Sequence, residues 1–101
     1  MREIKVIADH MDDTLGEADT YYKDYYIYKD SCPRLSSMAL YMAKEHLDLY
    51  MKWHTVAVEL IGEYRKSGKA IPDGMEDRYN ERHGELKEEY DRIAWLISQA
   101  K

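Results

Sequence analysis

Residues 35–66 read LSSMALYMAKEHLDLYMKWHTVAVELIGEYRK, and this stretch decides the fold. At the ~100° per residue of an α-helix, apolar side chains fall along one line, which consists of Ala43, Leu47, Tyr50, His54, Ala57, Ile61 and Tyr64. Further apolar residues flank this line on both sides, so the apolar arc is wider than the ~100° stripe of an ordinary surface helix. We therefore expect a long helix that is central in the fold and covered by two neighbours.

Two further segments repeat apolar residues with the period of a helix. In residues 2–29 they are Ile4, Ile7, Met11, Leu15, Ala18, Tyr22 and Tyr25. In residues 74–100 they are Met75, Tyr79, His83, Leu86, Tyr90, Ile93, Ile97 and Ala100. Pro33 breaks the first period and starts the helix of residues 33–66, and short turns make neighbouring helices antiparallel. The sequence thus predicts an all-α fold, a single domain over residues 1–101 that forms an antiparallel up-down-up three-helix bundle, which dimerisation would complete.

Length and composition place the chain among single-domain globular proteins. It has 101 residues, of which 45% are hydrophobic, and no apolar run approaches the ~20 residues of a membrane span. The one cysteine, Cys32, has no partner for an internal disulfide, which fits a reducing compartment. No signal segment is recognisable at the N-terminus, so we expect a cytoplasmic protein with no membrane partner.

The net charge of −5 is unevenly distributed. Five acidic residues stand close together in the first helix with no lysine or arginine among them: Asp9, Asp12, Asp13, Glu17 and Asp19. This distribution disfavours direct binding of nucleic acid through a basic patch. The acidic face is either a solvated helix surface or a surface that meets a basic protein partner.

The aromatic composition is unusual, with ten tyrosines and no phenylalanine. Five of the tyrosines lie within residues 21–28, around more of the helix than one buried face needs, and Trp95 lies opposite the apolar stripe of its own helix. These side chains either pack around the end of the second helix or form an exposed patch for a partner. The candidate interface residues are Tyr21, Tyr26, Tyr28 and Trp95, and a second copy of the chain is the first candidate partner.

The four histidines raise the question of a metal site. In an up-down-up bundle, the ~1.5 Å rise per residue places His10, His54 and His83 at similar heights, one on each helix. Three imidazoles and a nearby carboxylate could hold zinc or iron. The alternative is that the histidines are hydrogen-bonded residues of the core. We favour this alternative and expect no cofactor.

Several short segments resemble small ferritin-like helical proteins of Firmicutes and their prophages. In chain order they are the tyrosine-rich first helix with Glu17-Ala18-Asp19, then Ala43-Lys44-Glu45-His46, Trp53-His54, Ile61-Gly62-Glu63-Tyr64-Arg65, Pro72, Met75, and Tyr79 before His83. Ferritin-like di-metal sites use glutamates and Glu-x-x-His pairs. The positions three residues before the histidines are Ile7, Ala43, Met51 and Asn80, so that motif is absent. The resemblance implies that any residual metal site would use Glu17, His54 and His83.

A second resemblance concerns the spacing of an arginine and a histidine. Arg78 and His83 are separated by four residues, which resembles the catalytic pattern of the HEPN ribonucleases, helical proteins that cut RNA in a dimer cleft. No glycine-rich phosphate loop, nucleophile elbow or His-Glu-x-x-His motif is present. The leading interpretation is a non-catalytic interaction protein that self-associates or docks to a protein partner, a class that includes phage-type inhibitors. The alternatives are a ferritin-like metal-binding protein and a HEPN-like ribonuclease.

Overall fold

The computed structural model describes residues 2–68 and 74–100, and this part of the chain contains three α-helices and no strand. The helices are α1 (Arg2–Tyr28), α2 (Pro33–Lys66) and α3 (Met75–Ser98). The all-α class is therefore confirmed, and the observed bounds lie close to the expected ranges of 2–29, 33–66 and 74–100. None of the described helices combines the length and the apolar character that are needed to cross a membrane.

The ends of α2 follow from its sequence. Pro33 occupies the first helical position, where its missing N–H would have no intrahelical partner in any case. At the other end, Arg65 and Lys66 lie in the last turn, where positive charge interacts favourably with the helix dipole. Gly68 follows with a φ of +73°, a left-handed conformation that glycine adopts without steric cost.

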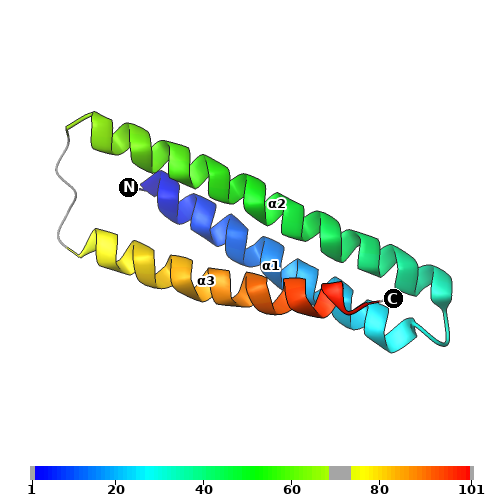
Figure 1. The fold of residues 1–101 in the computed structure, drawn as a ribbon. Helices are drawn as coiled ribbons and strands as arrows, with labels where there is room; N and C mark the ends of the chain where they lie inside the picture. Colours follow the sequence, from blue (N-terminus) through cyan, green and yellow to red (C-terminus); the bar gives the residue numbers. More distant parts are fainter. Residues whose placement is uncertain (1, 69–73, 101) are drawn as a thin grey trace.

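The three helices lie side by side in a rod of 57 × 18 × 18 Å (Figure 1). Contacts between α1 and α2 show that these helices run in opposite directions. The His10 ring stacks on the Trp53 ring with centroids 4.8 Å apart, and Glu17 contacts His46 further along. The partner's residue number falls as the residue number on α1 rises, which is the register of antiparallel helices.

Two ion pairs hold α3 beside α1 in the same direction. Arg82 donates a hydrogen bond of 2.7 Å to Asp9, and Arg92 donates one of 3.1 Å to Asp19. Asp9 and Asp19 are as far apart along α1 as Arg82 and Arg92 are along α3, and the residue numbers rise in the same direction. The two helices are therefore parallel. Figure 1 shows the same arrangement, with α1 between α2 and α3.

The core is built from small residues between α1 and α2 and from larger ones toward α3. Ala18 and Ala43 are completely buried, and Ala39 and Ala57 nearly so, which lets the two helices approach each other closely. The largest side chains with less than 2% exposure are Leu15 of α1 and Ile93 of α3. The apolar stripes predicted for the first and third helices supply most of this core.

The expectation that the second helix is central is wrong. Of the three helix pairs, α1 and α2 contact each other most extensively and α2 and α3 least, so α1 is the helix that joins the other two. The wide apolar arc of α2 therefore has one well-covered side and one side without a neighbour in the chain. The physical reason is that α3 is held to α1 by ion pairs and by its own stripe, which leaves part of α2 exposed.

Candidate interaction surface

The predicted interface residues fall into different environments. Tyr21 is half-buried against the core, and its ring centroid lies 5.1 Å from that of His46. Tyr21 therefore contributes to the packing of α1 on α2, and only part of its side chain is accessible to a partner. Tyr26 and Tyr28 are exposed at the end of α1, where the Lys29 ammonium lies over the Tyr26 ring.

Trp95 is 63% exposed on α3, as expected from its position opposite the apolar stripe. Its neighbours one turn away along the helix are polar, namely Asp91, Arg92, Ser98 and Gln99. A single exposed aromatic residue in polar surroundings is common on protein surfaces, whereas continuous apolar patches mark interfaces. Trp95 is thus exposed without being part of a continuous apolar surface.

A continuous apolar surface lies instead along α2. Leu35, Met42, Leu49 and Val56 recur every seven residues and point to nearly the same side of the helix. Leu35, Met38, Leu49 and Val56 are between 40% and 56% exposed, and Met42 and Leu60 are half-buried. We call this set the outer stripe, and it consists of Leu35, Met38, Met42, Leu49, Val56 and Leu60.

Charged residues follow one edge of the outer stripe. On the edge next to α1 lie His46 and Trp53, which contact α1. On the other edge, exposed charged residues follow one another in the order Arg34, Glu45, Lys52, Glu63. The signs of these charges alternate from the start of α2 to its end.

The outer stripe is visible in the sequence as part of the wide apolar arc of residues 35–66. The wide apolar arc of residues 35–66 predicts two neighbours for this helix, and the structure supplies one extensive neighbour from the same chain, α1. The repeat of exactly seven residues among Leu35, Met42, Leu49 and Val56 was the available signal. A repeat of seven is typical of helices that pack along each other in coiled coils.

The histidines form two separate groups. The Nε2 atoms of His54 and His83 lie 3.0 Å apart, and the Tyr79 ring stacks on His83 with centroids 6.0 Å apart. Burial, followed by the nearby His54 and Lys87, lowers the pKa of His83 below its ordinary value of 6.5. This group connects α2 with α3.

The second group connects α1 with α2. His46 is buried, its Nδ1 donates to the Met42 carbonyl at 2.8 Å, and its Nε2 lies 2.7 Å from the Glu17 carboxylate. His10 is exposed and stacks on Trp53. Glu17 therefore lies with His46 and not with His54 and His83, because the antiparallel register places it about two helical turns away from His54.

The alternative of a metal site built from Glu17, His54, His83 and His10 therefore does not have its four residues together. Within residues 2–68 and 74–100, no group of three or more histidine, cysteine or carboxylate side chains is placed to hold a metal ion. Zinc and iron sites need at least three such protein ligands around one point. The two imidazoles that do meet are already paired with each other.

The acidic residues of α1 are partly used inside the chain. Asp9 and Asp19 hold α3 through Arg82 and Arg92, and the hydrogen bond from Arg82 is the largest cause of the lowered pKa of Asp9. Asp12 and Asp13 remain exposed next to Glu17. The acidic face is thus smaller than the sequence suggested.

Comparison of the chain with protein-family models, with curated proteins and with solved structures finds no match.

Proposed function

We propose that this chain is a non-catalytic helical interaction protein that works as a homodimer, with the outer stripes of two α2 helices packed against each other. The observation that carries the proposal is the exposure of apolar side chains every seven residues along a helix of 34 residues. Exposure of such a stripe to water is unfavourable, and its burial is the main driving force of association. A dimer would give the wide apolar arc of α2 the second neighbour that the chain itself lacks.

The charges beside the outer stripe favour an antiparallel pair. Arg34 and Glu63 lie at equal distances from a midpoint between residues 48 and 49, and so do Glu45 and Lys52. When two α2 helices related by a two-fold axis pack antiparallel about this midpoint, the charged edge of one copy contacts the same edge of the other copy. Arg34 then lies opposite Glu63 of the second copy, and Glu45 opposite Lys52, so each charge meets its opposite.

The acidic side of α1 limits where the second copy can lie. Glu17 contacts His46 at the edge of the outer stripe, and Asp13 lies one helical turn before it on α1. Both carboxylates are exposed, and two copies of this side would repel each other. The second copy is therefore displaced toward the edge that carries Glu45 and Lys52. A two-fold dimer is also the commonest assembly of soluble proteins.

Sedimentation equilibrium tests the proposal with a matched pair of variants. Leu49→Lys places two like charges close together at the two-fold axis, and we expect it to weaken association by tenfold or more, which corresponds to about 1.4 kcal/mol. Val58→Lys is the control, because Val58 is 52% exposed on the same helix but lies on the opposite side of it. The control is expected to associate as the wild type does.

Two results would contradict the proposal. The first is a wild-type chain that stays monomeric up to about 100 μM, well above the dissociation constants of specific dimers. The second is equal weakening by Leu49→Lys and Val58→Lys, which would indicate association through another surface. Trp95→Ala extends the test, because loss of the dimer in that variant alone would place the interface on α3.

A further inference from the structure

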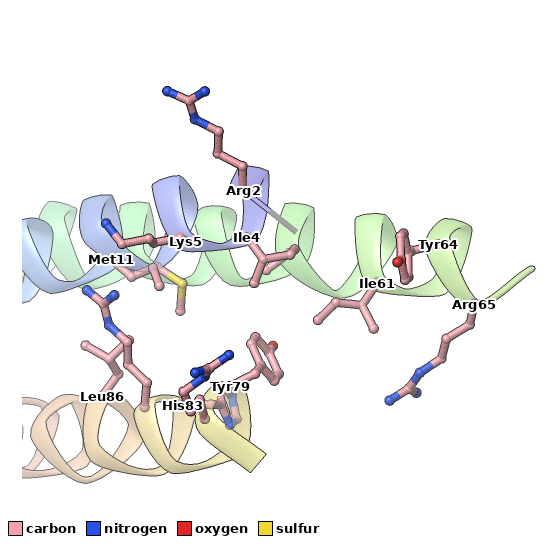
Figure 2. Close-up of a pocket in the computed structure, with 14 residues that line it drawn as sticks. Arg2, Ile4, Lys5, Met11, Ile61, Tyr64, Arg65, Tyr79, His83 and Leu86 are labelled. Carbon is pink, nitrogen blue, oxygen red and sulfur yellow. The ribbon is translucent and has the colours of Figure 1, made fainter. Parts of the chain in front are cut away.

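An apolar cleft of about 650 Å³ opens at the end of the rod where α1 begins, α2 ends and α3 begins. Figure 2 shows Ile4 and Met11 of α1 and Ile61 of α2 on one side of the cleft, with Tyr79 and Leu86 of α3 on the other. The cleft exists because α2 and α3 contact each other sparsely. Its volume lies within the ~300–1,000 Å³ that is typical of small-molecule sites.

The cleft is basic, although the chain as a whole carries a net charge of −5. Among the described residues that line it, five are basic and none is acidic, the basic ones being Arg2, Lys5, Arg65, Arg78 and Arg82. These residues come from three separate segments of the chain, the first turns of α1, the last turn of α2 and the first two turns of α3. The fold therefore concentrates positive charge around an apolar floor.

Only part of this charge is neutralised by the neighbouring carboxylate. Asp9 accepts a hydrogen bond of 2.7 Å from Arg82 and lies 3.6 Å from the Lys5 ammonium. Arg2 and Arg78 make no ion pair with another residue in the described ranges. In Figure 2 the Arg2 side chain points outward, whereas Arg65 points from the end of α2 toward the α3 side.

We propose that this cleft binds a single-chain amphipathic anion, with an alkyl or acyl chain between the helices and a carboxylate or phosphate head group at the basic rim near Arg78. The floor of Ile4, Met11, Ile61 and Leu86 is aliphatic, and burial of a hydrocarbon chain there is favourable at about 0.8 kcal/mol per methylene group. Guanidinium groups bind carboxylate and phosphate through paired hydrogen bonds. The excess of positive charge excludes a cationic head group.

This site is independent of the dimer proposed above, because the cleft lies at one end of the rod and the outer stripe runs along α2. Among the described lining residues, Ala57 and Ile61 adjoin the outer stripe in sequence, next to Val56 and Leu60, and both turn toward the core and the cleft rather than toward the stripe. Loss of dimerisation by Leu49→Lys should therefore leave the cleft intact. The two proposals can fail separately.

Isothermal titration calorimetry of the full chain tests the site with three ligands of equal chain length, each below its micelle-forming concentration. Dodecanoate and dodecyl phosphate are expected to bind one per chain, and the ratio of their affinities identifies the preferred head group. Dodecyltrimethylammonium carries the same chain with a positive head group and is expected not to bind. Inorganic phosphate alone is expected not to bind, because it lacks the chain.

A pair of charge-reversal variants places the head group. Arg78→Glu is expected to weaken binding of both anions about tenfold, which corresponds to about 1.4 kcal/mol. Arg78 lies near the N-terminus of α3, where an acidic residue interacts favourably with the helix dipole, so unfolding is not the expected cause of a loss. Lys44→Glu makes the same change of charge on α2 away from the cleft and is expected to leave binding unchanged.

The proposal is overturned by any of three results. One is equal binding of the cationic and anionic amphiphiles, and another is equal weakening by Arg78→Glu and Lys44→Glu. The third is the absence of a one-to-one complex with either anion up to millimolar concentration. If the protein then sediments with vesicles of an anionic phospholipid, the basic rim serves a membrane surface and not a single bound ligand.

Discussion

The contact between His54 and His83 makes the docking of α3 sensitive to acid. Two ring nitrogens 3.0 Å apart require that one donates and the other accepts a hydrogen bond, so an added proton removes the acceptor. Burial is the main cause of the lowered pKa of His83. Because the unfolded chain binds this proton more readily, the stability from neutral His83 is fully present above pH 6.5 and is lost as the pH falls through the folded pKa.

Substitution of His83 tests this dependence. His83→Gln keeps a polar side chain that does not titrate, so we expect the variant to lose less stability on acidification than the wild type. Urea denaturation at about pH 7.5 and about pH 5.5 gives the free energy of unfolding of each protein. His10→Gln, at an exposed histidine, is the control. The same loss of stability in the wild type and in His83→Gln would contradict the assignment.

At the scale of the helices, Ile93 is the most deeply buried residue of α3 in the core. It is completely buried, whereas Ile27 at the end of α1 is 63% exposed. Ile93→Ala leaves a cavity in the core and is expected to lower the free energy of unfolding by about 2–5 kcal/mol. Ile27→Ala is expected to change it by less than about 0.5 kcal/mol. Thermal or urea denaturation followed by circular dichroism measures both, and similar effects of the two variants would show that α3 packs differently.

The helices could be predicted from the sequence because their signals are local. The period of residues such as Ile4, Ile7 and Met11, and the position of Pro33, are properties of short segments. The sequence could not show that α1 joins the other two helices. The width of the apolar arc of α2 indicates how much of that helix is covered, but it does not distinguish a helix of the same chain from a helix of a second copy. A stripe that faces the core and a stripe that faces a second copy have the same residue types.

The candidate sites depend on contacts between distant segments, which explains why they were harder to predict. The resemblance to ferritin-like proteins groups Glu17 with His54 and His83, whereas the structure places Glu17 with His46, because the register between two helices is not a property of either sequence segment alone. The basic cleft combines Arg2, Arg65 and Arg78 from three helix ends, and no local pattern connects them. The proximity of His54 and His83 agrees with the similar heights predicted for them, since both lie on the predicted apolar stripes of their helices.

At the scale of the whole molecule, the alternating charges on α2 give the proposed dimer its direction. Arg34→Glu places two glutamates opposite each other in both copies of the contact, and exposed pairs contribute about 0.2–1 kcal/mol each. We therefore expect dissociation to become up to about tenfold easier. The double variant Arg34→Glu with Glu63→Arg restores opposite charges and should recover the wild-type dissociation constant in sedimentation equilibrium. A double variant as weak as the single one would argue against this pairing.

Site-specific disulfide formation tests the antiparallel dimer most directly. The variants are made in a Cys32→Ser background. In the proposed antiparallel dimer, the cysteine introduced by Leu49→Cys lies next to the same cysteine of the second copy across the two-fold axis, within the range in which disulfides form. Leu35→Cys would lie about 40 Å from its counterpart, given the ~1.5 Å rise per residue. The account predicts that Leu49→Cys forms covalent dimers under mild oxidation and that Leu35→Cys does not. Equal cross-linking at both positions, which a parallel pair would produce, or no cross-linking through Leu49→Cys, would contradict it.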